Sequence, residues 1–419
     1  GGNGTNLASN PDSGTVGSPS TYDAALSVAS INGQKSAYIQ ANGTEDQVAF
    51  ITEASDGDGN ELDFVDQLYR ITGKTKGETL NFKYVVIGSV GRTANYTQRV
   101  RREIENSDGY DGTIALVKRG DITFEEKVRN AMDAGATACV IYNNVSGTIR
   151  MSLGEVNNPI PTCAITMDAA KKIVEGAERN VGTIQIDSDF EAGPFMSDFS
   201  SWGPTPSLGI KPEITAHGGN IKSAIPGRDG DEYRYGKLSG TSMACPNLCG
   251  IVVLIRQYLK DGYGDELTEK QIKNLTNQLM MSTAGIAINE ENNPYSPRKQ
   301  GAGLADIGRT TTTKGYVTVD GSDRSKLELG DDPTRSGIYT MNFNVVNMSE
   351  TDLVYDFSLV GMTESVSTSD DKFVAETPHI LGNTFKAEFE GGDGNVSGNK
   401  ITVNGNASGT NANEWNSVK

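Results

Sequence analysis

Short apolar runs separated by turn-forming residues mark the chain from about residue 62 to residue 185. Such runs predict buried strands, and here they alternate with two helical patterns. The first helix follows a capping box from Thr123 to Glu126 and has an apolar face that includes Val128 and Ala131. The second helix is shorter, over about 168–174. The strand runs are 84–87, 113–117, 138–142 and 164–166. This segment is predicted to be a self-contained α/β or β-rich module.

Two further helices are predicted between about residue 190 and residue 310. The first, Met243 to Leu259, is apolar nearly all round in its central run from Ile251 to Ile255, a pattern that predicts a central, buried helix. The second covers about Thr268 to Met281, has apolar residues at core spacing, and begins with Thr268 as a plausible N-cap. We expect these helices to share one core.

The two ends of the chain have strand-like patterns. Near the N-terminus, Ala24 to Ala29 reads as one buried strand of a larger sheet. After about residue 312, apolar and polar positions alternate, which predicts the start of a β-sandwich. The alternating apolar positions are 339, 341, 343 and 345, then 353, 355, 357 and 359. Neither end closes a recognisable unit, so we expect the chain to be part of a longer one.

Length and composition narrow the function classes. A chain of 419 residues exceeds one typical hydrophobic core, so two or three domains are expected. Apolar residues make up 36% of the chain, and no run approaches the ~18 consecutive apolar residues of a membrane-spanning helix. The formal charge of −17 disfavours binding to nucleic acid or anionic lipid. The chain is expected to be soluble, with no nucleic-acid partner and no membrane-spanning segment.

The cysteines and histidines do not favour a metal site. Four cysteines in so long a chain are too sparse for a disulfide framework, and we expect buried free thiols. Cys245 and Cys249 are four residues apart on a predicted helix, but the whole chain has two histidines to join them. We therefore reject a zinc site and expect no cofactor. No loop has the dense carboxylate spacing that would compel calcium binding.

The run from Leu238 to Pro246 carries the clearest chemistry. It places Ser242 between a glycine turn and a long apolar helix, and Pro246 confines the helix start to the neighbourhood of Ser242. A serine there has its own N–H and the positive end of the helix dipole close to a developing oxyanion. Gly240 lets the backbone approach a substrate closely. Taken alone, a GTS tripeptide is more often an ordinary N-capping serine.

Four segments resemble the subtilase family. The string from Gly240 to Pro246 matches the family's nucleophile motif GTSMAxP at every defined position. The segment 199–204 matches FSSxGP, 211–221 resembles KPDITAPGGNI, and 300–307, QGAGLADI, matches the stretch after the catalytic core. Order and spacing agree throughout.

The resemblance implies a fold, a division into domains and a site. It implies an α/β fold, a subtilisin-like parallel sheet with helices on both faces, present in part. Residues 1–61 and 189–312 would form the catalytic domain. Residues 62–188 resemble a protease-associated domain, and 313–419 resemble a truncated fibronectin-type β-sandwich of lactocepin-like cell-envelope proteinases. Ser242 would be the nucleophile. The predicted substrate-binding residues are Ser200, Ser201, Gly203, Gly240 and Thr241.

The rest of a catalytic triad is not recognisable. In subtilases the aspartate and histidine motifs precede the part of the family that this chain resembles, so the missing N-terminal segment of the same protein is an expected partner. His217 stands where the family has proline, and we expect a structural or rim role for it. Asn3 is a candidate oxyanion-hole residue, whereas the DSG string at Asp12 is taken as a chance match.

The implied activity is hydrolysis of peptide bonds in protein or peptide substrates, outside the cell or at its wall. On its own, the chain is expected to be inactive. A catalytically inactive, subtilase-like binding module is the alternative. An α/β-hydrolase elbow at Gly240 to Ala244 is a weaker one, because that elbow reads G-x-S-x-G and its histidine follows the serine.

Overall fold

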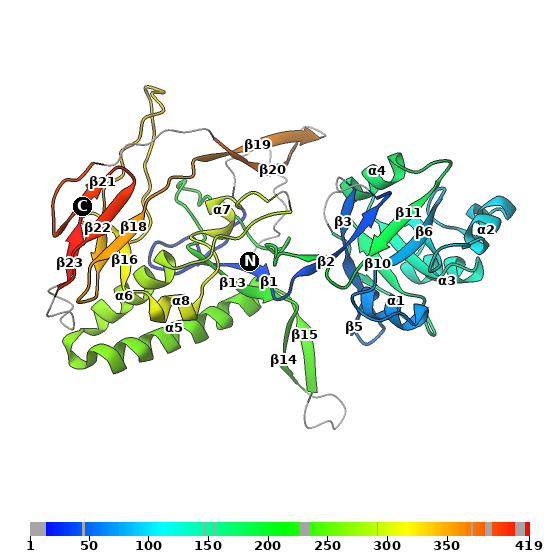
Figure 1. Cartoon of the computed structure of the whole chain (residues 1–419), viewed down its shortest axis with the longest axis horizontal. Coiled ribbons are helices and arrows are strands. Elements are labelled where there is room, and N and C mark those ends of the chain that lie inside the picture. The colour runs from blue at the N-terminus through cyan, green and yellow to red at the C-terminus, as the bar shows by residue number, and fades with distance from the viewer. Residues whose placement is uncertain are drawn as a thin grey trace. The chain divides into compact units, whose positions relative to one another are not determined.

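The computed structural model describes residues 14–43, 47–145, 148–154, 156–226, 234–290, 292–369, 372–381, 388–406 and 415–419. It divides into two compact units. The first, here called the nucleophile unit, comprises Gly1–Gln34, Pro194–Ser223 and Leu238–Lys419. The second, the insertion unit, comprises Lys35–Gly193 and Ala224–Lys237. Figure 1 labels the elements of both.

The insertion unit is built on one large mixed sheet. Its centre is parallel, with β6, β7, β8 and β10 as neighbours, and antiparallel strands extend it on both sides. The strands are β2 (Ser36–Ala41), β3 (Val48–Phe50), β4 (Thr52–Ser55), β5 (Glu61–Leu62), β6 (Leu80–Ile87), β7 (Thr113–Lys118), β8 (Ala138–Tyr142), β9 (Met151–Ser152), β10 (Thr162–Ile165), β11 (Val181–Ile186) and β12 (Glu191–Ala192).

Helices cover both faces of this sheet (Figure 1). Alternate residues of β6 and β7 point to opposite faces, so each face has its own hydrophobic cluster. Helices α1 (Phe64–Thr72) and α4 (Met167–Glu175) bury residues in one cluster, and α2 (Gln98–Glu105) and α3 (Phe124–Asp133) in the other. The 3-10 turn η1 lies at Thr93–Asn95. The predicted strands and helices of this region are present, and the side chain of Thr123 caps α3 by accepting from the Glu126 N–H.

The compact unit begins earlier than the domain boundary predicted at residue 62. Strands β2 to β4 lie before that boundary and β5 straddles it, yet all four belong to the large sheet. They are short, and β2 has no strict apolar alternation, so the sequence does not assign them to this sheet. The structural boundary at Lys35 reflects these long-range strand pairings.

In the nucleophile unit, β1 (Val28–Asn32) pairs in parallel with β13 (Ile214–Gly219). The predicted strand at Ala24 to Ala29 is thus present but begins later. On one face, Ile214 and Ala216 pack with α5 (Thr241–Tyr263) and α6 (Glu269–Ser282). On the other face, Ala29 and Ile31 form a smaller cluster. Thr268 is the N-cap of α6, as predicted, and the Gln271 side chain completes a capping box.

Short elements complete this unit. The hairpin of β14 (Ile221–Ile225) and β15 (Arg234–Leu238) precedes α5, and its outer part belongs to the insertion unit. The 3-10 turn η2 (Gly264–Glu266) follows α5, and α7 (Pro297–Gln300) and α8 (Ile307–Thr312) follow α6.

The C-terminal part consists of small antiparallel sheets. Two three-stranded sheets, of order β16-β17-β23 and β18-β22-β21, share a hydrophobic cluster that includes Val345, Val403 and Val418. The predicted strand at 339–345 begins only at Phe343, and Tyr339 and Met341 are exposed. The strands are β16 (Gly315–Val319), β17 (Phe343–Asn347), β18 (Leu353–Asp356), β19 (Met362–Ser369), β20 (Lys372–Ile380), β21 (Gly394–Ser397), β22 (Lys400–Val403) and β23 (Asn416–Val418).

Candidate functional site

Ser242 is the second residue of α5, at the predicted helix N-terminus. The N-cap residue Gly240 is extended and contributes no side-chain cap, while its carbonyl accepts from the N–H groups of Met243 at 2.9 Å and Ala244 at 3.3 Å. The first N–H groups of an α-helix have no intrahelical partner. The N–H of Ser242 is therefore a donor at the positive end of a 23-residue helix, where it can stabilise an oxyanion.

The side chain of Ser242 is accessible. Ser242 is exposed, and Gly240 and Thr241 beside it are half-buried. Within the part of the chain that the structure describes, the Ser242 hydroxyl makes no hydrogen bond. It is thus available to a substrate and to a general base.

A close backbone approach sets the start of α5 against β13. The Gly240 N–H donates to the Gly218 carbonyl at 2.8 Å. A Cβ atom at Gly218 would lie 2.6 Å from the Gly240 carbonyl oxygen and 2.5 Å from the Ser30 hydroxyl. Only glycine at position 218 leaves room for this packing, which fixes the turn that precedes Ser242.

Two of the other predicted site residues lie in the interior. The Ser200 side chain is completely buried, and its hydroxyl accepts from the Ser30 N–H at 3.0 Å. Gly203 is also buried, and its N–H donates to the Arg298 carbonyl at 2.9 Å. Ser201 is half-buried. The described contacts of Ser200 and Gly203 are therefore with the scaffold, and any effect of these two residues on substrate would be indirect.

Neither histidine has a described contact with Ser242. His217 lies between Ala216 and Gly218 on β13, and both of these face α5, so the His217 side chain points to the opposite face. Its Nδ1 lies 2.9 Å from the Asn32 carbonyl oxygen. His379 is exposed on β20, in a two-stranded sheet with β19. This geometry gives His217 a structural contact, and among the described residues neither histidine is hydrogen-bonded to Ser242.

Glu213 is committed to a buried ion pair. Its carboxylate lies 2.6 Å from the Lys211 ammonium and 3.1 Å from that of Lys326, and it accepts from the Ser27 N–H at 2.7 Å. Lys211 and Glu213 are nearly inaccessible to solvent, so each is stabilised by the other's charge. Glu213 therefore ties the beginning of β13 to β1, and is not available to orient a catalytic histidine.

The prediction that α5 is buried nearly all round is wrong. The buried residues are Ala244, Leu248, Ile255 and Leu259, which form one stripe. Val253 is 64% exposed and Leu254 is 57% exposed. An apolar sequence predicts the need for a cover, but no element in the described residues covers this face. We call it the open face of α5. It runs from Ser242 through Cys245 and Cys249 to Leu254.

The four cysteines differ in their exposure to solvent. Cys139 and Cys163 are buried free thiols, as predicted, whereas Cys245 and Cys249 are free but exposed, which corrects the prediction for that pair. Partial burial and the neighbouring Cys249 thiol raise the pKa of Cys245. Among the described residues, no group of three or more histidine, cysteine, aspartate or glutamate side chains offers a metal site.

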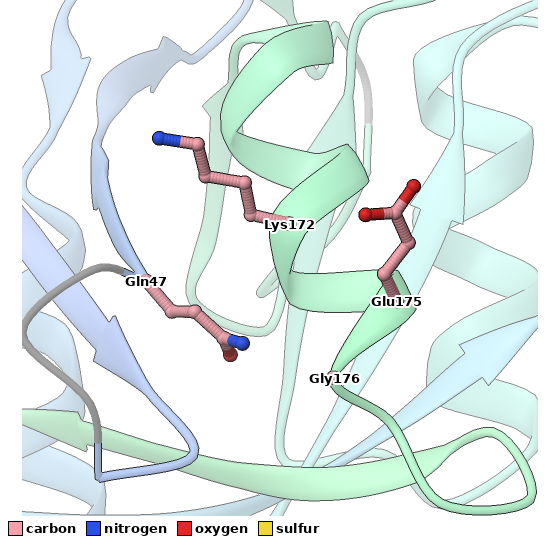
Figure 2. A pocket seen from close by; sticks show the side chains of 4 residues that line it. All are labelled: Gln47, Lys172, Glu175 and Gly176. Atoms are coloured by element: carbon pink, nitrogen blue, oxygen red, sulfur yellow. The ribbon is translucent and has the colours of Figure 1, made fainter.

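By length and composition, α5 also meets the criteria for a membrane-spanning helix, a test that core helices of soluble proteins pass too. The absence of a membrane span accordingly stays a prediction. A shallow hollow lies in the insertion unit, lined by Gln47, Lys172, Glu175 and Gly176 (Figure 2). It contains no residue predicted to act in catalysis.

A serine that opens a long helix beside a parallel β-strand is typical of serine hydrolases with an α/β fold. The chain belongs to the subtilase family, whose model matches residues 1–303. The mixed α/β architecture fits a subtilisin-like fold, and membership supports a serine peptidase.

The sequence of this chain is similar to those of three bacterial proteases. C5a peptidase of Streptococcus pyogenes is 28% identical over 410 residues, covering 96% of this chain and 30% of the relative. Minor extracellular protease Vpr of Bacillus subtilis is 34% identical over 271 residues, covering 63% of this chain and 32% of the relative. PII-type proteinase of Lactococcus lactis subsp. cremoris is 31% identical over 235 residues, covering 52% and 12%. The chain thus spans about a third or less of each relative's length.

Proposed function

We propose that this chain is the nucleophile-bearing part of a subtilisin-like serine endopeptidase. The observation that carries the proposal is the position of Ser242, exposed at the N-terminus of α5 in a subtilase chain. The Ser242 Oγ would attack a peptide carbonyl and pass its proton to a general base. The amine would leave with that proton, and water would hydrolyse the acyl-enzyme. The Ser242 N–H and an asparagine side chain would stabilise the oxyanion. Asn3, the candidate for that role, lies outside the described residues.

The general base would come from further polypeptide of the same protein. A serine hydroxyl is a weak nucleophile without an adjacent base. The position of His217 on the far face of β13 and the commitment of Glu213 to two lysines make a triad from these residues a poor explanation. The open face of α5 supports the proposal, because an apolar surface that begins at Ser242 suits a packed protein segment. On its own, we expect the chain to be inactive.

The remaining residues and units would bind substrate or control its access to Ser242. We propose that Gly240 and Thr241 contact substrate beside Ser242, while Ser200, Ser201 and Gly203 support the wall of the cleft. The insertion unit would be a protease-associated domain that limits access, and the C-terminal sheets a truncated fibronectin-type domain. Protein substrates and an extracellular or cell-wall location are proposed from the relatives, one of which is named an extracellular protease. A calcium requirement stays open to test.

Labelling with a fluorophosphonate probe, followed by peptide mapping, tests this function. The chain is labelled alone and together with the upstream part of the same protein, and Ser242→Ala is the control. We expect labelling at Ser242 only when the upstream part is present, and cleavage of an unfolded protein substrate at internal bonds. Labelling at another serine would refute the assignment.

A catalytically inactive binding module is the alternative. If Ser242 is labelled neither in the chain alone nor in its complex with the upstream part, the binding module is the better explanation. If the chain were instead an esterase built on an α/β-hydrolase elbow, the probe would label it without the upstream part. It would then hydrolyse ester but not peptide substrates.

A further inference from the structure

Two polar residues, Asn220 and Ser239, are hydrogen-bonded to each other at the end of the β14–β15 hairpin where its strands join the rest of the chain. Asn220 directly precedes β14 and Ser239 directly follows β15. The Asn220 N–H donates to the Ser239 Oγ at 2.8 Å, and that hydroxyl donates back to the Asn220 Oδ1 at 3.0 Å. One hydroxyl thus satisfies a backbone donor and a side-chain acceptor of the same residue.

The backbone of Asn220 is adapted to this arrangement. Its φ angle is 57°, in the left-handed region that asparagine tolerates better than most other residues. Asn220 is exposed and Ser239 is half-buried, so their hydrogen bonds lie at the surface and contribute little to global stability. A role for the pair must then come from where it lies.

The pair lies next to the turn that carries the nucleophile. Ser239 is joined to Gly240, whose N–H is bonded to the Gly218 carbonyl at 2.8 Å. We call the backbone of Ser239 and Gly240 the strap. The start of α5 lacks a side-chain cap, so the direction of its first turn depends on the strap. Two hydrogen bonds at Ser239 and one at Gly240 hold the strap against the end of β13. Ser242 follows within the same turn.

We propose that Asn220 and Ser239 are positioning residues for Ser242. They hold the strap so that the Ser242 N–H and Oγ keep the direction that attack on a carbonyl needs. This inference rests on the proposed peptidase function for its catalytic consequence, but its structural part is independent of that function. A small misplacement of a reacting group lowers the rate far more than it lowers stability.

The first test uses Ser239→Ala and Ser239→Thr, with hydrogen exchange followed by mass spectrometry on the chain itself. Ser239→Ala removes the acceptor of the Asn220 N–H. We expect exchange in the segments around residues 220 and 240 to become at least about fivefold faster, with an unchanged unfolding temperature. Ser239→Thr keeps the hydroxyl and should restore protection. Unchanged exchange in Ser239→Ala would overturn the proposal, whether or not Ser242 is catalytic.

Variants of Asn220 separate the side chain from the backbone angle. Asn220→Asp keeps the acceptor oxygen and should behave like the native chain. Asn220→Gly keeps the left-handed angle but lacks the acceptor, and we expect intermediate protection. The control is Ser336→Ala, which removes an exposed hydrogen bond to Asp332 in the C-terminal part. If Asn220→Gly matches the native chain in exchange and in labelling, only the backbone angle matters, and the proposed role of the side chain is wrong.

The catalytic consequence is read from the rate of fluorophosphonate labelling at Ser242 with the upstream part present. Ser239→Ala should lower that rate about tenfold or more, Ser239→Thr should recover it, and substrate KM should change less than kcat. A lower kcat with unchanged exchange, or faster exchange with unchanged labelling, would contradict the positioning role. If the native chain is never labelled, the proposed function fails, and the exchange experiment still decides whether the pair holds the strap.

Discussion

The insertion unit and the nucleophile unit differ in how completely their central elements are covered. The parallel strands at the centre of the insertion unit have helices on both faces, and Leu116 and Val117 of β7 are both completely buried. In the nucleophile unit, α5 packs on β13 along one stripe and leaves Leu254 57% exposed. A closed core can support itself, whereas the open face leaves Leu254 and Val253 without cover among the described residues.

The largest expected difference between the units is in thiol reactivity. Cys245 and Cys249 are exposed, whereas burial raises the pKa of Cys139 to about 12 and that of Cys163 as well. Because the thiolate is the reactive form, we expect Cys245 and Cys249 to react with a maleimide at least about a hundredfold faster than the buried pair. Mass spectrometry of the labelled peptides measures the rates.

The control for thiol reactivity is the double variant with Cys245→Ser and Cys249→Ser, which should have no fast thiol. Equal rates for all four cysteines would show that the insertion unit is not closed. Slower reaction of Cys245 and Cys249 when the upstream part is added would sharpen the comparison, because it would show that the open face becomes covered.

The next effect in size is the loss of a core side chain. Leu116→Ala removes a completely buried side chain from β7, and we expect it to lower the free energy of unfolding of the insertion unit by about 2–5 kcal/mol. The matched change on the open face, Leu254→Ala, should alter stability by about 0.5 kcal/mol or less. Hydrogen exchange resolved by segment measures both. A large cost for Leu254→Ala would mean that the open face is covered within this chain.

Alanine substitutions at two glycines test the packed side and the open face of α5 against each other. Gly218→Ala would place its Cβ 2.6 Å from the Gly240 carbonyl oxygen, so we expect a loss of about 1–3 kcal/mol and slower labelling of Ser242. Apart from its chain neighbours and the backbone of its own helix, no described atom lies within 4 Å of a Cβ built at Gly250, and Gly250→Ala should stabilise the helix by up to about 1 kcal/mol. Thermal unfolding checks both signs, and destabilisation by Gly250→Ala would contradict the open face.

The smallest effect is a pH dependence in the insertion unit. Burial is the main cause that raises the pKa of Glu53 to about 8, with smaller contributions from the charges of Asp63 and Glu61, whereas the Phe64 N–H and Lys237 oppose it. The folded state then binds this proton more tightly than the unfolded state, whose pKa is near 4.5. The resulting stabilisation is full below pH 4.5 and is lost as the pH rises through about 8.

Glu53→Gln should remove this loss, which we expect to be on the order of 1 kcal/mol between pH 7 and pH 8. The glutamine oxygen can still accept from the Phe64 N–H, which the native carboxylate binds at 2.9 Å. Unfolding curves of both proteins at several pH values provide the measurement, with the exposed Glu175→Gln as control. A steeper pH dependence in Glu53→Gln than in the native chain would contradict the sign.

Much of the fold could be predicted where the signals are local. The cap at Thr268 and the apolar spacing after it predict α6, and the run at 138–142 coincides with β8. Burial of α5 could not be predicted, because an apolar helix indicates a need for contacts but not which contacts exist. The strand expected at Tyr339 failed for the same reason, since a strand forms only where a neighbour pairs with it, and β16 pairs with β17 only from Phe343 onward.

The candidate site divides in the same way. The glycine, the serine and Pro246 determine by themselves that Ser242 opens a helix, because steric and hydrogen-bonding rules act within one turn. Only the tertiary structure decided that His217 faces away from that helix, that Gly218 permits the approach of Gly240, and that Asn220 meets Ser239. These relations join segments that are distant in sequence, and they depend on how strands and helices pack, which local sequence patterns do not specify.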